Sequence, residues 1–259
     1  MAAQSFDTED YKWEETPAFV EIDTGDHMES YVILLDKRII EYAFDEETGE
    51  LITYDTYHKK IRVNNDDAIE RWNKVYISIH DVISVIDIQA RAVTASGKVT
   101  EVDRESIKEV DNLEDQGAFK IFAVEGVEVG CDIEYFYTVK RMGGFFNRVF
   151  FQTKGEVKMA HFELISPENL VFLAKGYNGF PDPKDTVIDE KRYLIATKEN
   201  IPLLDEERYA AYRSNLMRVE YKISHNELRS SAEMFTWSDA ARTVSYTHLT
   251  LPTSVIGEI

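Results

Sequence analysis

The chain has 259 residues, of which 48 are acidic and 29 basic, so its formal net charge is −19 at pH 7. That charge argues against a nucleic-acid partner, because such proteins carry basic patches. A single cysteine excludes an intrachain disulfide and a cysteine-rich zinc site, and no apolar run reaches the roughly 18 residues of a membrane helix.

The first 28 residues are polar and acidic, with apolar anchors only at Trp13, Phe19 and Ile22. Residues 1–28 therefore predict a leader that drapes over the surface of a folded domain. The first four residues, MAAQ, resemble the end of a signal-peptide cleavage region without its apolar stretch. Met1 is then either an internal start or the start of a cytoplasmic protein, and the residues alone leave both interpretations open.

Period-two alternation of apolar and polar residues dominates residues 31–223, which is typical of half-buried β-strands. Val75, Ile77 and Ile79 alternate with polar side chains, and the same pattern recurs over residues 86–92 and 217–223. Such strands bury one face and expose the other to water, as antiparallel sheets allow.

Short turn signals separate these strands. Residues 46–50 (EETGE) and 95–98 (ASGK) each join two strand-like runs and predict hairpins, because glycine supplies the positive φ of a tight loop. A pair of glycines follows the strand-like run 131–140 at positions 143 and 144. Residues 181–183 (PDP) predict a surface loop, because proline does not fit a central strand.

Helices are expected to be few and short. Residues 65–73 place Ala68, Ile69 and Trp72 on one face, and Asp67 and Glu70 have the spacing of a capping box. Residues 205–213 are a second candidate helix. A doubly wound α/β fold needs long helices between strands, so we expect a mainly β protein: an antiparallel β-sandwich over residues 29–230 with a few short helices.

The C-terminal end of the sequence has a different character. Thr236 is a plausible helix N-cap, and residues 231–243 predict the start of a linker helix that leads towards a missing core. Residues 244–253 (VSYTHLTLPT) resemble the translated sequence of a common sequencing adapter. We therefore interpret residues 244–259 as a non-native tail and the native sequence as a truncated fragment.

Cys131 is the only candidate thiol nucleophile. On a strand it shares a face with Ile133 and Tyr135, beside Asp132 and Glu134, which predicts a small core residue rather than an activated thiolate. Five histidines, at positions 27, 58, 80, 161 and 225, lie far apart in sequence, and a sixth, His248, lies in the tail. This spacing indicates no zinc motif, although a site assembled by the fold stays open.

Acidic clusters occur at residues 45–47, 64–67 (NNDD), 111–115 and 205–207, and they suit turns and helix caps better than calcium loops. The aromatic pairs at residues 145–146 and 150–151 are consistent with core packing or with an exposed rim for a ligand. The sequence contains no P-loop, no G-x-G-x-x-G and no G-x-S-x-G motif. We therefore assign no catalytic, cofactor-binding or metal-binding residue, and no cofactor.

Several segments together resemble a known family. They are residues 37–42 (KRIIEY), 58–63 (HKKIRV), 90–93 (ARAV) and 120–130 (KIFAVEGVEVG), followed by the strand 131–139. In order and spacing they are similar to a bacterial domain of unknown function that precedes transglutaminase-like cores in exported proteins. The resemblance covers residues 31–237.

The resemblance implies a β-sandwich-like domain, a signal peptide and a following papain-like core with a Cys-His-Asp triad. It therefore implies a periplasmic or cell-envelope location. Cys131 does not fall where the family's catalytic cysteine does, so no catalytic residue carries over. The leading hypothesis is a non-catalytic accessory domain that positions the core or binds a substrate or partner. The alternatives are a stand-alone envelope module that binds carbohydrate or peptide, and an enzyme in its own right that uses a carboxylate pair.

Overall fold

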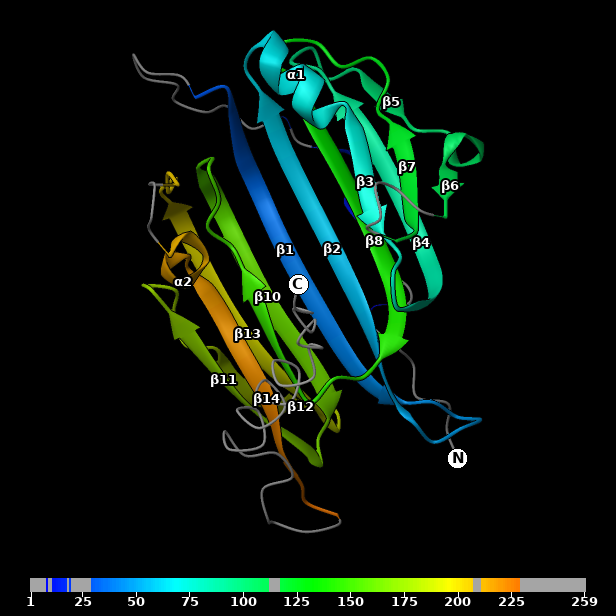
Figure 1. Cartoon of the computed structure of the whole chain (residues 1–259), viewed down its shortest axis with the longest axis vertical. Coiled ribbons are helices and arrows are strands. Elements are labelled where there is room, and N and C mark those ends of the chain that lie inside the picture. The colour runs from blue at the N-terminus through cyan, green and yellow to red at the C-terminus, as the bar shows by residue number, and fades with distance from the viewer. Residues whose placement is uncertain are drawn as a thin grey trace, which may run out of the picture.

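The computed structural model describes Thr8, residues 11–17, Phe19, and residues 29–111, 117–206 and 211–228. These residues form a mainly β protein in which antiparallel sheets pack together with a few short helices, so the predicted fold class is confirmed (Figure 1). The elements in chain order are β1 (Tyr31–Phe44), β2 (Leu51–Val63), α1 (Asp66–Trp72), β3 (Lys74–Ser78), β4 (Val82–Val93), β5 (Val99–Glu101), the 3₁₀ turn η1 (Arg104–Ser106), β6 (Lys108–Val110), β7 (Phe119–Ala123), β8 (Asp132–Met142), β9 (Phe146–Phe150), β10 (Val157–Pro167), β11 (Leu170–Tyr177), β12 (Lys184–Ile188), β13 (Lys191–Ile201), α2 (Tyr212–Asn215) and β14 (Arg218–Asn226).

The large sheet has eight strands in the order β12-β13-β10-β1-β2-β8-β4-β5. Adjacent strands in this sheet are antiparallel, except that β1 and β10 run parallel, with Arg38 opposite Phe162. The chain crosses to a different sheet at β9 and returns at β10 in the same direction as β1. A parallel pair needs such a crossover, and the alternation of residues along a strand does not encode it.

Two three-stranded sheets, β3-β7-β6 and β11-β14-β9, pack against one face of the large sheet. Figure 1 shows β3 and β7 over its upper part and β11 and β14 over its lower part. We call the covered face the inner face and the opposite one the outer face. The apolar core lies between these layers and includes Ile33, Tyr42, Ile61, Ile77, Phe122, Ile133, Phe162, Phe172, Tyr221 and Ile223.

The expected turns form where glycine permits them. Gly49 (φ 69°) closes the β1–β2 hairpin, and Gly97 (φ 82°) closes the β4–β5 hairpin. Residues 181–183 lie in a loop before β12.

The helices differ from expectation in detail. The N-cap of α1 is Asn65, whose side chain accepts a hydrogen bond from the Ala68 N–H at 2.9 Å, in place of the predicted box from Asp67 to Glu70. The helix expected over residues 205–213 is wrong at its start, because Asp205 and Glu206 are not helical and α2 covers only Tyr212–Asn215. The amide and carboxylate side chains compete for backbone donors, and spacing alone does not decide which one caps.

The sequence predicts that the polar face of each strand is exposed to water. This prediction is wrong for the central strands of the large sheet. Glu41 on β1, Arg62 on β2 and Asp132 on β8 all point to the outer face, yet all three are buried. The N-terminal residues that the structure describes lie over this face. Thr8 donates two hydrogen bonds to Glu41 Oε2, from its N–H at 3.0 Å and its hydroxyl at 2.6 Å. The described residues among the first 28 thus form a third layer over the outer face.

Three expectations concern parts of the sequence that lie outside the described residues. They are Ile22 as an anchor, the linker helix over residues 231–243 and the tail at 244–259. Within the part of the chain that the structure describes, no helix is long and apolar enough to span a membrane.

Candidate functional site

Cys131 lies in the apolar core between the sheets and is 0% exposed. Burial raises the pKa of its thiol, and the nearby carboxylates of Asp132 and Glu128 act in the same direction. A neutral, enclosed thiol is a poor nucleophile, because the thiolate is the reactive form. The structure therefore gives Cys131 the surroundings of the small core residue that the sequence predicts.

The histidines stay apart in the fold. His58 is buried on the outer face, while His80, His161 and His225 lie on different elements beside Asp81, Glu163 and Ser224 respectively. His27 and His248 lie outside the described residues. Among the residues with described positions, no three His, Cys, Asp or Glu side chains gather as metal ligands.

The acidic cluster at residues 45–47 occupies the β1–β2 turn, and Asp66 and Asp67 lie in the first turn of α1, as their sequence predicts. Asp45 accepts hydrogen bonds from the N–H groups of Glu47 and Thr48, and its carboxylate lies 2.7 Å from Lys140 Nζ. The hydrogen bond from Lys140 is the main cause that lowers the pKa of Asp45 to about 2. Glu206 pairs with Lys154 at 2.8 Å, and residues 112–115 lie outside the described part of the chain.

The aromatic residues of the pairs 145–146 and 150–151 differ in their exposure to solvent. Phe145 is 49% exposed, whereas Phe151 is fully buried and stacks on Phe180 with ring centres 4.6 Å apart. Phe150 lines a cleft on the inner face of the large sheet. Core packing therefore holds for Phe151, and the ligand rim stays a prediction.

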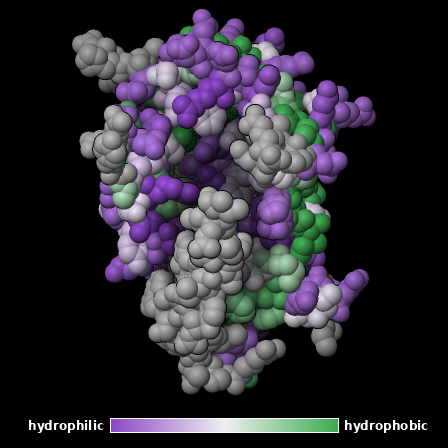
Figure 2. Space-filling view, in the orientation of Figure 1, coloured by the Kyte–Doolittle hydropathy of each residue, from purple (hydrophilic) through white to green (hydrophobic). Residues whose placement is uncertain are grey.

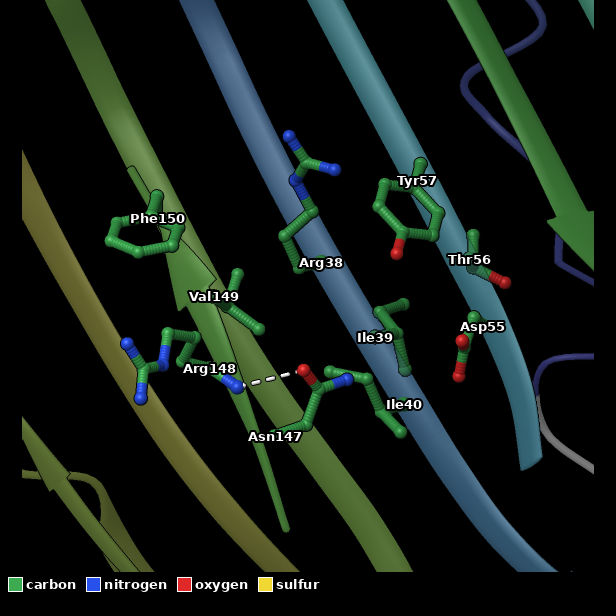
Figure 3. A pocket seen from close by; sticks show the side chains of 10 residues that line it. All are labelled: Arg38, Ile39, Ile40, Asp55, Thr56, Tyr57, Asn147, Arg148, Val149 and Phe150. Carbon is green, nitrogen blue, oxygen red and sulfur yellow. Dashed lines mark hydrogen bonds between the residues drawn. The ribbon is translucent and has the colours of Figure 1, made fainter. Parts of the chain in front are cut away.

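That cleft has a volume of about 270 Å³ and is lined by residues of β9 and of the strands β1 and β2 of the large sheet (Figure 3). The space-filling view shows a hollow lined by hydrophilic residues in the middle of the same side of the molecule (Figure 2). The cleft is lined by Arg38, Ile39, Ile40, Asp55, Thr56, Tyr57, Asn147, Arg148, Val149 and Phe150.

Asp36 and Arg38 form a buried ion pair at one end of the cleft. Arg38 donates to the Asp36 carboxylate at 2.5 Å and 3.2 Å, and Lys59 Nζ lies 3.1 Å from the same carboxylate. Burial acts to raise the pKa of Asp36, but the two cations outweigh it and hold the pKa below its ordinary value. Burial lowers the pKa of Lys59 in spite of Asp36. Asp36 thus stays ionised, and its charge is matched locally.

Tyr57 stands between two neighbours on the floor of the cleft. The Arg38 guanidinium lies 4.5 Å from the centre of the Tyr57 ring, and the Tyr137 ring stacks on Tyr57 with centres 4.8 Å apart and 10° between the planes. These side chains come from adjacent strands, because Arg38 pairs with Tyr57 and Tyr57 with Tyr137 across β1, β2 and β8. Arg38 and Tyr137 therefore occupy the faces of the Tyr57 ring.

Asp55 is the unusual group of the cleft. It is 7% exposed, its Oδ2 lies 3.6 Å from Arg141 Nε, and its Oδ1 has no hydrogen-bond partner. Burial raises the pKa of Asp55 to about 6, against the opposing effects of the Arg141 charge and of a side-chain hydrogen bond with Thr53. A buried oxygen without a partner is destabilising unless a donor reaches it, so Asp55 is equipped to receive one from a ligand.

The outer face holds a second buried network, centred on Glu134. His58 Nε2 lies 3.0 Å from one carboxylate oxygen, and Arg91 lies 2.7 Å from the other. Tyr11 reaches the remaining nitrogen of His58 at 2.7 Å. Next to this group, Asp132 pairs with Arg62 and lies 3.5 Å from Lys60 Nζ. These groups join the described N-terminal residues to the sheet.

Sequence reasoning missed Asp36, Arg38, Asp55 and Tyr57 as a group. A signal was present: Asp55, Tyr57 and Lys59 continue the alternation that puts Ile61 and Val63 in the core. Polar side chains on the apolar side of a strand need partners or a ligand. Only the register of β1, β2 and β8 shows that these residues meet under β9.

Residues 53–202, more than half of the chain, match the family described as "Domain of Unknown Function with solved-structure structure (DUF3857)". A crystal structure of a "putative protease" from Parabacteroides distasonis shares the fold, with a TM-score of 0.64 at 14% identity. The matched region covers 74% of this chain and 40% of that one, so the chain spans less than half of that protein's length. No curated protein matches the sequence.

Proposed function

The chain belongs to the DUF3857 family, and from that premise we propose that it is a non-catalytic accessory domain of a longer, transglutaminase-like cysteine enzyme. In this role it positions the catalytic core or binds the substrate or partner of the core. The single observation that carries the proposal is the recurrence of this fold within a longer protein described as a "putative protease", of which it covers 40%.

The surroundings of the lone cysteine support a non-catalytic role. A cysteine nucleophile needs a neighbouring base or cation that lowers its pKa, and the thiol of Cys131 is enclosed with a raised pKa. The nucleophile of the proposed enzyme would therefore belong to a separate core. The resemblance to domains of exported proteins is the basis on which we propose a cell-envelope location.

A second candidate is a stand-alone module of the envelope that binds peptide or carbohydrate. The cleft favours it, because a partner-free carboxylate oxygen at Asp55 and the aromatic side chain of Phe150 line one enclosed space. Binding sites of this kind combine apolar walls with a few polar groups that fix orientation.

The experiment that tests the proposal begins with the source locus beyond the codon for Thr243. If a core with Cys, His and Asp follows, the longer protein is assayed for peptide hydrolysis and acyl transfer, with and without residues 29–228. We expect activity on a protein substrate to fall when the domain is deleted, and the 259-residue chain alone to be inactive. Activity of the chain alone that Cys131→Ser abolishes would overturn the proposal. A stop codon near Thr243 would favour the stand-alone module.

A further inference from the structure

We propose that the inner-face cleft binds an extended peptide as an added strand on β9, with a basic side chain of the peptide paired to Asp55. The inference rests on the proposed function in one respect: it takes this cleft as the binding site of the accessory domain. It names the ligand class, an extended polypeptide with a lysine or arginine.

One edge of β9 is not paired with another described strand. This strand is the last of its sheet, and β14 is its only hydrogen-bonded neighbour among the described strands. The bonds from Ile223 N–H to Phe145 O and from Phe151 N–H to Met217 O show which residues face β14. Because the pairing direction alternates along a strand, Arg148 and Phe150 direct their backbone groups to the open side, where an added strand would pair.

Arg148 already shows how such a bond would form. Its N–H donates to the side chain of the preceding residue, Asn147 Oδ1, at 2.8 Å, and Figure 3 shows this bond at the mouth of the cleft. An amide oxygen thus occupies the position that a peptide carbonyl would take on the added strand. A short local bond of this kind can be exchanged for a strand bond at little net change in free energy.

The floor of the cleft lies beside that edge. A strand added to β9 would run over β1 and β2, and every second side chain would point down towards Ile40, Tyr57 and Asp55. Asp55 Oδ1 has no partner although the residue is more than nine-tenths buried. An ammonium or guanidinium group supplies the missing donor and also balances the charge of the carboxylate.

The other charges of the cleft do not compete for that role. Arg38 is matched by Asp36 through two hydrogen bonds, and Arg148 lies 3.9 Å from Glu220 on β14. Arg141 Nε lies 3.6 Å from Asp55 Oδ2, and Asp55 Oδ1 has no hydrogen bond from the described residues. The chain as a whole carries a charge of −19, which attracts a basic partner over a longer range.

The same geometry argues against a sugar as the ligand. Carbohydrate sites stack a sugar on the open face of an aromatic ring. Arg38 at 4.5 Å and Tyr137 at 4.8 Å lie against the Tyr57 ring, and the Arg213 guanidinium lies 5.3 Å from the centre of the Phe150 ring. What the cleft leaves available is a strand edge and a carboxylate oxygen, and an extended basic peptide uses both.

The test measures calorimetric binding of a blocked nonapeptide of alternating Thr and Val with one central Lys to the full 259-residue chain. Two matched peptides serve as controls: one with norleucine for Lys, and one with N-methyl groups at alternate amides. We expect the Lys peptide to bind at least about tenfold more tightly than either control. Asp55→Asn should remove the preference for Lys over norleucine, whereas Asp185→Asn, a carboxylate on β12 paired with Arg192, should retain it.

The edge is tested at Arg148. Arg148→Pro removes the N–H that the added strand needs, and Arg148→Ala keeps it; proline is tolerated at an edge because this N–H is not used by the sheet. We expect only the proline variant to weaken binding about tenfold or more. Circular dichroism spectra and melting curves of each variant establish that it is folded.

Equal binding of the Lys and norleucine peptides, or no binding of either at about 1 mM, overturns the inference. Binding of a neutral oligosaccharide that Asp55→Asn abolishes also overturns it, in favour of a carbohydrate module. The two proposals fail separately. If no peptide binds but the activity of a following core depends on the domain, only the peptide site is wrong. If the Lys peptide binds and no core is encoded, only the accessory role is wrong.

Discussion

The Arg91 guanidinium lies 3.9 Å from the centre of the Trp13 ring, so a residue of the first segment stacks on a buried cation of β4. Arg91 is 2% exposed and also pairs with Glu134. This one side chain therefore joins the N-terminal segment to the buried polar network around Glu134 on the outer face. A similar contact places the Arg62 guanidinium 3.9 Å from the Phe19 ring. The two anchors predicted at Trp13 and Phe19 thus both cover arginines of the outer face.

Replacing Trp13 should therefore destabilise the fold measurably. Trp13→Ala removes the cation–π contact with Arg91 and the edge-to-face packing on Phe136, whose ring centre lies 5.1 Å from that of Trp13. We expect a loss of about 2 kcal/mol in the free energy of unfolding, since the ring is only partly buried. Urea titration followed by circular dichroism measures it. The exposed neighbour provides a control: Lys12→Ala should change stability by less than about 0.5 kcal/mol. Equal effects of the two changes would contradict the anchoring role.

Glu134→Gln should be more damaging, because it leaves Arg91 buried without its anionic partner. Removing one partner of a buried pair costs about 3–5 kcal/mol. Glu109→Gln, which breaks the exposed pair with Lys120, should cost less than about 1 kcal/mol. Thermal and urea unfolding of both variants measures the difference.

The pH dependence of the Glu134 effect follows from its pKa. Burial acts to raise the pKa, but the hydrogen bond from His58 and the charge of Arg91 lower it below the ordinary 4.5. The stabilisation from Glu134 is therefore present above about pH 4.5 and is lost as the pH falls through the lower folded value. The difference between wild type and Glu134→Gln should shrink in acid. A difference that is constant down to about pH 3 would contradict this account.

The sequence predicts the strands, both hairpins and the first helix because each depends on local signals. Gly49 and Gly97 supply positive φ, and the alternation through β3 and β14 sets which side chains enter the core. The parallel pairing of β1 with β10 depends on where the chain returns after β9, and no local pattern contains that information.

The site could not be predicted for a related reason. Asp55 looks like any polar residue on a half-buried strand, and its raised pKa arises only when β9 and β14 close over β2. The buried network around Glu134 was not predicted, because the residues that cover it come from a segment whose sequence predicts a polar leader. In both places, polar side chains on strands became buried through packing between segments far apart in sequence.

Cys131 gives a prediction about reactivity. Its thiol should not react with a disulfide reagent such as dithionitrobenzoate in the native protein and should react fully in denaturant, since burial encloses it and raises its pKa. Cys131→Ser should reduce stability by about 1–3 kcal/mol, because it buries a hydroxyl in the apolar core, and Cys131→Ala should cost less. Peptide binding should be the same in all three. Rapid labelling of the native thiol would contradict this assignment.

Asp55 should weaken the fold at neutral pH, and the sign of the effect can be worked out. Its folded pKa of about 6 lies above the ordinary 3.8, so the folded state binds more protons between those values. Stability therefore falls as the pH rises from about 4 to 6, and the ionised group costs on the order of 3 kcal/mol above that window. Asp55→Asn should be more stable than wild type at pH ~7.5 and nearly equal to it at pH ~4.

Asp36→Asn, on the same face of the sheet, is the control, because its effect on stability at neutral pH should have the opposite sign. Arg38 and Lys59 hold the pKa of Asp36 below its ordinary value, so that variant should be less stable at neutral pH, and the difference should shrink in acid. Melting curves of both variants and the wild type between about pH 4 and 8 make the comparison. A pH-independent effect of Asp55→Asn would show that the carboxylate is not held near pKa 6. The expected result means that the fold keeps a destabilising charge in its cleft, as binding sites do when a ligand supplies the missing partner.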